Sequence, residues 1–464
     1  MTASFALRVE TDLLGPRQLP AEALYGIHTL RAAENFPVSR ALIGHYPELV
    51  RGLAMVKLAA ARANRDLGVL GVAHHDAIAA ACAQLLEGQH HDAFVVGMIQ
   101  GGAGTSTNMN ANEVIANLGL IALGRRPGDY AHLHPNDHVN RSQSTNDVYP
   151  TALRIALLLA ARPLEDELAR LAQAFRDRAG DFAQVLKLGR TQLQDAVPMT
   201  LGAEFAGFAA GVEQDLRHLR TALAELTAVN LGGTAIGTGI TAPEGYGPCA
   251  RAHLAAISGY EIRAAEDLIE ASSDMGALVA VSAALRRVVL RLSKICNDLR
   301  LLSSGPRAGL GEIHLLPVQA GSSIMPGKIN PVIPEMVSQI AYQVIGHDLS
   351  VTMAAEAGQL QLNAMEPLIA HALLESLRLL ASGVPVLRLR CVEGIRADAE
   401  RCRAHLEAST AMCTPLVPVI GYSRASGLAQ RALAENRPLA DLVVAEGLMS
   451  AAEFAALERA ACAV

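Results

Sequence analysis

Tryptophan is absent from this chain of 464 residues, and aromatic residues make up only 3% of it. Because 51% of the residues are nonetheless hydrophobic, a core has to be built mainly from Ala, Leu, Val and Ile. Such residues suit long, closely packed helices better than a β-sandwich, which draws on aromatic side chains. The composition therefore predicts a mainly α fold.

A disulfide framework is also missing. The seven cysteines include no C-x-x-C pair and stand at positions 82, 249, 296, 391, 402, 413 and 462. A scattered, odd-numbered set is typical of reduced thiols in a cytoplasmic protein. The cysteines therefore indicate neither a disulfide scaffold nor a zinc site.

Segments for export or membrane insertion are lacking as well. Residues 1–15 alternate apolar residues with Arg8, Glu10 and Asp12, unlike the core of a signal peptide. The longest charge-free stretch, 226–243, is rich in Gly, Thr and Asn and is too polar to span a membrane. We therefore expect a cytoplasmic protein without a membrane partner.

A broad positive field is absent too. The formal net charge of −6 is mild, and a nucleic-acid surface would need clustered basic residues. An anionic substrate would therefore be held by local hydrogen-bond donors and a few cations. We expect no nucleic-acid partner.

The densest polar segment of the chain is G-S-S-I-M-P-G-K-I-N-P at 321–331. Gly321 and Gly327 permit backbone angles closed to other residues, and Pro331 suits the start of a helix. An ordinary surface loop would explain the composition alone. The combination of hydroxyls, one lysine and an amide before a helix N-terminus also favours an anion site and a closing lid.

Three further polar segments precede long apolar runs. They read G-G-A-G-T-S-T-N-M-N at 101–110, N-R-S-Q-S-T-N-D at 140–147 and G-R-T-Q-L-Q-D-A-V-P at 189–198. Their hydroxyl and amide groups are suited to cap helices, or to bind a carboxylate without an added charge. Both interpretations remain open on the residues alone.

Helical spacing of apolar residues predicts helices near 149–162, 163–186, 200–226 and 275–302, and another from about 334 past 345. The glycine-rich run at 231–239 has no Walker lysine and no preceding strand pattern, so nucleotide binding is not predicted. His132, His134 and His138 lack a further ligand at a recognisable spacing, so no metal site is predicted there.

These segments, with Y-G-I-H-T-L-R-A-A-E-N-F at 25–36, resemble the conserved segments of the aspartase/fumarase superfamily. Members of this family eliminate across a C–N or C–O bond and release fumarate. The resemblance follows the family's order over nearly the whole chain. It implies a mainly α, three-domain subunit with domains at 1–141, 142–393 and 394–464.

The resemblance also implies an assembly and a site. The subunit would form a homotetramer with a 20-helix core, and each active site would draw on three subunits. Ser322 would be the catalytic base that removes a proton from a small dicarboxylate and gives an aci-carboxylate intermediate. The implied substrate-binding residues are Thr105, Ser144, Thr145, Asn146, Thr191, Gln192, Ser323, Lys328 and Asn330. No organic cofactor is implied, and activation by a divalent cation is left open.

A few positions that differ between aspartases and fumarases indicate which group leaves the substrate. His28 and Gln192 stand where fumarases usually carry other residues, which favours reversible deamination of L-aspartate to fumarate and ammonia. Thr241 and Ser272-Ser273 depart from the family pattern and keep an N-substituted or nitrogen-modified aspartate as an alternative. Fumarate hydration is a third reading. A non-catalytic relative is the alternative of a different class, but it would be expected to have lost Ser322 or Lys328.

Overall fold

The computed structural model describes residues 6–462, so the first five residues of the segment 1–15 lie outside the described part. The chain divides into two compact units, each made of three stretches. Unit 1 comprises the chain up to Leu164, His218–Arg286 and Gln343–Leu379, and unit 2 comprises Glu165–Arg217, Arg287–Tyr342 and the chain from Leu380 onward. The predicted three-domain division stays a prediction.

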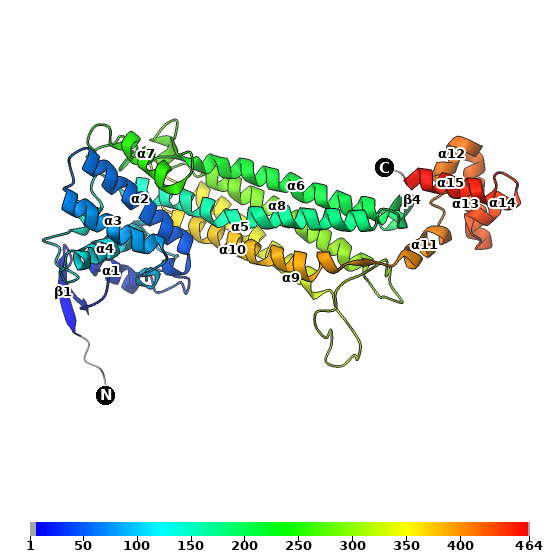
Figure 1. Cartoon of the computed structure of the whole chain (residues 1–464), viewed down its shortest axis with the longest axis horizontal. Coiled ribbons are helices and arrows are strands. Elements are labelled where there is room, and N and C mark those ends of the chain that lie inside the picture. Colours follow the sequence, from blue (N-terminus) through cyan, green and yellow to red (C-terminus); the bar gives the residue numbers. More distant parts are fainter. Residues whose placement is uncertain (1–5, 463–464) are drawn as a thin grey trace. The chain divides into compact units, whose positions relative to one another are not determined.

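Helices make up most of the described chain (Figure 1). They are α1 (Ile27–Asn35), α2 (Pro47–Asp66), α3 (Val72–Leu86), α4 (Thr105–Ala122), α5 (Thr145–Asp181), α6 (Leu201–Ala224), α7 (Tyr246–Ser258), α8 (Gly276–Leu302), α9 (Val332–Glu356), α10 (Glu366–Arg390), α11 (Ala399–Ala408), α12 (Cys413–Ile420), α13 (Tyr422–Glu435), α14 (Leu439–Ala445) and α15 (Ala451–Cys462). The strands are β1 (Leu7–Asp12), β2 (Gly15–Pro20), β3 (Leu186–Thr191), β4 (Gln194–Thr200), β5 (Ala228–Val229), β6 (Arg263–Ala264), β7 (Ile313–His314) and β8 (Arg396–Ala397). They pair two by two, as β1–β2, β3–β4, β5–β6 and β7–β8, and only β5–β6 is parallel.

In unit 1, α2 and α4 are buried on nearly all faces. Pro47 and Glu48 stand in the first turn of α2, where a missing N–H and a negative charge are favoured. Every residue of α4 from Thr107 to Leu120 is buried, including several asparagines and Glu113. Glu113 accepts backbone hydrogen bonds from Gly26, His28 and Thr29 and so caps the start of α1. The polar groups of α4 therefore join the aliphatic core to the N-terminal segment.

Helix α5 is continuous from Thr145 to Asp181, where the sequence predicted two helices meeting at Pro163. A proline inside a helix removes one hydrogen bond and costs about 3 kcal/mol. Leu157, Leu164 and Leu168 are at most 1% exposed, and burying each such side chain contributes about 1.5–3 kcal/mol. Burial on both sides of Pro163 therefore outweighs the lost hydrogen bond.

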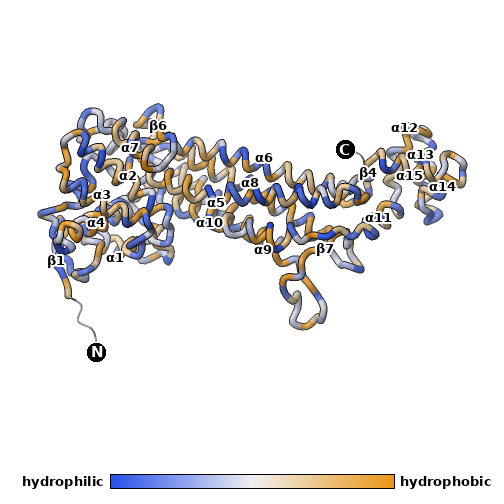
Figure 2. Tube along the Cα trace, in the orientation of Figure 1, coloured by the Kyte–Doolittle hydropathy of each residue, from blue (hydrophilic) through white to orange (hydrophobic). Residues whose placement is uncertain are grey.

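In unit 2, the segments of the long helices are joined by aromatic and ionic contacts. Four of the eight phenylalanines, Phe175, Phe182, Phe205 and Phe208, pack with ring centroids 5.2–6.1 Å apart. The buried carboxylate of Asp215 accepts hydrogen bonds from two arginines of α8. Hydrophobic and hydrophilic residues alternate along α6 and α8 (Figure 2). Buried residues recur about every third or fourth position along both helices, so each helix keeps one apolar side for its neighbours.

The C-terminal helices α12–α15 enclose a small core of their own within unit 2. Leu416, Leu428, Leu442 and Phe454 are among its buried residues. This region contains helices and no strand, in line with the predicted mainly α class. Together with the long helices of the other stretches, it confirms that class for the described residues.

One helical stretch among the described residues, Glu366–Gly394, is long and apolar enough to cross a membrane by length and composition alone. Of its most apolar window, 56% is buried inside the protein. Core helices share this length and composition, so the stretch is weak evidence for a membrane span. The expectation of no membrane partner stays a prediction.

Candidate functional site

The first group of predicted residues lies where α4 and α5 begin, in unit 1. Thr105 and Thr145 are the first residues of these two helices. Asn108 Nδ2 donates a hydrogen bond to Thr145 Oγ1 at 3.1 Å. A helix N-terminus carries unpaired N–H groups and partial positive charge, so this arrangement favours an anion.

Asp147 holds the turn that carries Ser144. Its buried carboxylate accepts hydrogen bonds from the backbone N–H groups of Ser144 at 3.0 Å, Gly232 at 2.9 Å and Thr234 at 3.1 Å. Burial raises the pKa of Asp147, while these three N–H groups and Lys57 act in the opposite direction. One carboxylate thereby fixes the 144–147 turn to the glycine-rich run.

Asn146 is partly committed to the fold. Its side-chain Nδ2 donates to the backbone carbonyl of Ala235 at 2.7 Å, and its backbone carbonyl accepts from Asn230 Nδ2 at 2.9 Å. The side-chain oxygen and one remaining N–H of the amide are not used in these bonds. A role of Asn146 near a substrate amino group would rest on those atoms.

Lys57 lies beneath the same turn and was not predicted as a site residue. It is fully buried, and its Nζ donates to Asn140 Oδ1 and Gln143 Oε1, both at 2.9 Å. Burial lowers the pKa of Lys57 to about 7, although Asp147 acts to raise it. Asn140 also accepts a hydrogen bond from Asn108 of α4. Lys57 therefore helps to position both the start of α4 and the segment that precedes α5.

Thr191 and Gln192 lie at the turn of the β3–β4 hairpin in unit 2. Thr191 pairs with Gln194, which leaves a two-residue loop of Gln192 and Leu193. Both loop residues have positive φ, 54° and 62°, where Asn and Gly are the usual occupants. Leu193 is also 70% exposed. Strained backbone with an exposed apolar side chain is typical of a functional turn.

A buried ionic cluster supports this hairpin. Glu312, which is fully buried, lies 2.7 Å from Arg190 and 3.2 Å from Lys187, and His405 is 2.9 Å away. Burial opposes ionisation of Glu312, but Lys187, His405 and Arg190 hold its pKa below the usual value. Arg190 directly precedes Thr191, so the cluster fixes the hairpin at the base of the turn.

The third group lies on the exposed loop between β7 and α9, in unit 2 (Figure 1). Ser322 Oγ accepts hydrogen bonds from the backbone N–H groups of Ile324 at 3.1 Å and Met325 at 3.0 Å. Two such donors stabilise negative charge on the oxygen.

The base of this loop is closed by its own residues. Gly321 N donates to the carbonyl of Lys328 at 2.8 Å, and Asn330 Nδ2 donates to the carbonyl of Gly321 at 2.7 Å. Ser323 and Lys328 lie on the exposed part between these bonds. Asn330 therefore has a structural role beside its predicted role in binding.

The predicted residues thus fall into three local groups. Unit 1 gathers Thr105 with Ser144, Thr145 and Asn146, whereas unit 2 carries the hairpin group and the loop group. Within unit 2, no hydrogen bond among the described residues joins the hairpin turn to the loop of Ser322. Their joint use in one site stays a prediction.

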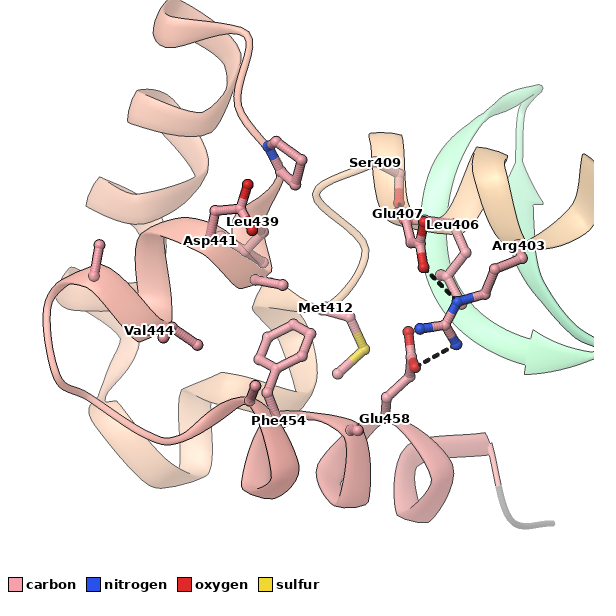
Figure 3. A pocket seen from close by; sticks show the side chains of 15 residues that line it. Arg403, Leu406, Glu407, Ser409, Met412, Leu439, Asp441, Val444, Phe454 and Glu458 are labelled. Carbon is pink, nitrogen blue, oxygen red and sulfur yellow. Dashed lines mark hydrogen bonds and ion pairs between the residues drawn. The ribbon is translucent and has the colours of Figure 1, made fainter. Parts of the chain in front are cut away.

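Cavities occur both beside and away from these groups. One of about 600 Å³ in unit 1 is lined by Asn140, Gln143 and Thr241, close to the α5 turn. Another of about 570 Å³ lies among the C-terminal helices and holds apolar side chains with Arg403 paired to two glutamates (Figure 3). This second cavity contains none of the predicted site residues.

Two rings of the histidine cluster bind backbone groups of their own turn, and the expected absence of a metal site there stays a prediction. His134 Nδ1 accepts from the backbone of Asn136 and Asp137, and His138 Nδ1 accepts from the backbone of His134. These rings therefore cap their own turn. A different group, which sequence reasoning missed, brings Asp66, Cys249 and His253 together. Its signal was the spacing of Cys249 and His253, four positions apart in a helix.

Comparison with known proteins assigns the family. A family model described as Lyase matches residues 15–346, and one described as Fumarase C C-terminus matches residues 412–460. The chain belongs to the aspartase/fumarase superfamily. An aspartate ammonia-lyase from Pseudomonas canavaninivorans is 58% identical over 97% of this chain and 95% of its own length.

Solved structures of this superfamily have the same fold. A fumarate lyase:delta crystallin from Brucella melitensis bound to cobalt is 55% identical, with a TM-score of 0.95 and 98% of both chains covered. A class II fumarase from Schistosoma mansoni is 32% identical, with a TM-score of 0.91, covering 97% of this chain and 98% of its own. Superfamily membership, inferred from the polar segments, is confirmed.

Proposed function

We propose that this protein is an aspartate ammonia-lyase, which converts L-aspartate reversibly to fumarate and ammonia. The observation that carries the proposal is the 58% identity to an aspartate ammonia-lyase over nearly the full length of both chains. Identity to the class II fumarase is far lower, at 32%. Elimination of an amine is therefore favoured over elimination of water.

Ser322 is the proposed base. It takes a proton from the carbon beside one carboxylate of the substrate, and the resulting charge spreads into that carboxylate. The C–N bond of the protonated amino group then breaks, and ammonia leaves with the bonding electrons. The hydrogen bonds from Ile324 and Met325 to Ser322 Oγ support this role, because they stabilise the serine oxygen as an alkoxide.

The remaining residues are proposed to hold the two ends of the dicarboxylate. Hydroxyls of Thr105, Ser144, Thr145 and Ser323 donate to the carboxylate that takes up charge. Thr191, Lys328 and Asn330 bind the other carboxylate, and Asn146 and Gln192 contact the amino group. Two neighbouring helix starts support the first assignment.

A homotetramer in the cytoplasm is the proposed form of the enzyme, with three subunits contributing to each site. The loop of Ser322 closes over the substrate and excludes water. No organic cofactor takes part. Cobalt in the structure of the Brucella melitensis relative supports keeping a divalent cation among the proposed effectors.

A substrate panel tests the proposal. Purified protein is given L-aspartate, L-malate, and fumarate with ammonia or with a series of amines. We expect fumarate and ammonia in equal amounts from L-aspartate, and no turnover of L-malate. Fumarate is followed by its ultraviolet absorbance and ammonia by a coupled assay. Turnover of malate but not aspartate would overturn the proposal, and addition of substituted amines alone would assign the alternative substrate class.

A further inference from the structure

Three different ligating side chains meet where α2 ends against α7, both in unit 1 (Figure 1). Asp66 is the last residue of α2, and Cys249 and His253 lie one turn apart on α7. A carboxylate oxygen of Asp66, the sulfur of Cys249 and a ring nitrogen of His253 all lie within 4.8 Å of one another. Residues four apart share one face of a helix, so α7 presents both of its ligands to α2.

We propose that Asp66, Cys249 and His253 form a binding site for a zinc-class divalent cation. A set of one sulfur, one nitrogen and one oxygen suits Zn²⁺ or Co²⁺ and does not suit Mg²⁺, which prefers oxygen ligands alone. A thiolate and a carboxylate carry two negative charges, and a neutral imidazole carries none. The bound dication is therefore neutralised by its ligands.

The geometry requires only small side-chain movements. His253 Nε2 lies 2.7 Å from Asp66 Oδ2, whereas two ligands with bonds of about 2.0 Å to a tetrahedral zinc stand about 3.3 Å apart. Arg65 binds the other oxygen, Asp66 Oδ1, at 2.8 Å from its NH2 group. Arg65 thus orients the carboxylate and leaves Oδ2 toward the cation, as outer partners of metal ligands do.

Partial exposure supplies an entry path and a fourth ligand. The side chains of Asp66 and His253 are 38% and 24% exposed, and Cys249 is partly buried. A water molecule completes the tetrahedron at the open position. Binding forms a bond between the Cys249 sulfur and the metal and releases the thiol proton to solvent, with no change of oxidation state.

The site lies close to Asn64, which binds the segment just before α5. Asn64, two residues before Asp66, donates from Nδ2 to the carbonyl of Arg141 at 2.8 Å and accepts from Ser142 Oγ at 2.7 Å. A cation that ties the end of α2 to α7 also restrains this contact. Metal binding therefore stabilises unit 1 around the 140–147 segment.

Cobalt binding to the full chain tests the proposal. Protein treated with chelator is titrated with CoCl₂ and ZnCl₂ while absorbance and melting temperature are recorded. Wild type is expected to bind one cation per chain, to show a thiolate-to-cobalt charge-transfer band, and to melt at a higher temperature with Zn²⁺. Cys249→Ser and His253→Gln should each lose the band and bind at least about tenfold more weakly.

Matched controls separate this site from other thiols and other cations. Cys413→Ser removes the other partly buried cysteine and should keep the band and the shift in melting temperature. MgCl₂ should produce neither effect. Circular dichroism confirms that each variant is folded. The proposal is overturned if wild type shows no band, or if folded Cys249→Ser binds cobalt as wild type does.

Discussion

The side-chain oxygen of Ser322 accepts two hydrogen bonds within its own turn. The backbone N–H groups of Ile324 and Met325 both point to Oγ, at 3.1 and 3.0 Å. An oxygen that accepts two hydrogen bonds from its own turn loses its proton more easily than a free hydroxyl. These two hydrogen bonds support the proposed role of Ser322 as the base.

Replacing this oxygen gives a direct prediction. Ser322→Ala should assemble normally and lose about 10²–10⁴ in kcat with L-aspartate, because the proposed general base is removed. Steady-state kinetics measures the loss. Ser423→Ala, at an exposed position of α13, is the matched control and should keep the wild-type kcat and KM. If Ser322→Ala turns over at near the wild-type rate, another group is the base.

Among single residues, the sequence predicted the hydroxyl-bearing site residues but not the buried lysine that supports them. Ser144, Thr145 and Asn146 stand in a recognisable polar segment. Lys57 stands in an Ala-rich helix more than 80 positions from Asn140 and Gln143, and only the folded chain joins them. Contacts between distant positions leave no local pattern, so buried supporting residues could not be predicted.

At the scale of elements, the start of α10 contains an unusual buried acid. Glu366 is its first residue and is 2% exposed. Burial raises the pKa of Glu366 to about 8, and Arg154 offsets this only in part. The carboxyl therefore keeps its proton in the folded protein through most of the neutral range.

This shift predicts a pH-dependent stability. Between the ordinary value of 4.5 and about 8, the unfolded chain has lost the proton that folded Glu366 keeps. The free energy of unfolding should therefore fall as pH rises through this window, by on the order of a few kcal/mol. Glu366→Gln has no such proton, so its stability relative to wild type should rise with pH.

Urea denaturation of wild type and Glu366→Gln at several pH values between 4.5 and 8 measures the effect. Glu400→Gln, in the exposed first turn of α11, is the control and should show no such trend. A constant difference between wild type and Glu366→Gln across the window would contradict the prediction.

Elements were predicted well where apolar spacing is strong and poorly where burial overrides local preference. The helix predicted at 200–226 is observed as α6 (Leu201–Ala224). Pro163 was read as a boundary, yet α5 passes through it because its leucine side chains are buried on both sides. The β3–β4 hairpin escaped prediction because Gln192-Leu193 lacks the Asn or Gly that usually marks such a turn.

For the whole molecule, the order of the polar segments was enough to identify the superfamily, and the composition was enough to predict a mainly α fold. Assembly could not be derived in the same way. Neither composition nor spacing states which surfaces of this chain meet in an oligomer. The homotetramer and its shared sites rest on the resemblance.

Shared sites predict complementation between two inactive variants. Thr145→Ala and Ser322→Ala should each lose most activity when refolded alone. Refolded together as mixed tetramers, they should regain about a quarter of wild-type activity, because some sites receive both native residues from different subunits. Fumarate production by the mixture is the measurement. Mixtures no more active than the separate variants would mean that each site belongs to a single subunit.

The clamp formed by Asp147 has a consequence for changing what this protein accepts. Asp147 fastens Ser144, Gly232 and Thr234 from below, whereas Thr241 stands exposed at the edge of the adjoining cavity, outside that clamp. The residues bound to Asp147 thus hold the turn in place, whereas Thr241 can be replaced without breaking any of these hydrogen bonds. Directed evolution toward bulkier amines can vary Thr241 and its neighbours while the hydrogen bonds to Asp147 stay intact.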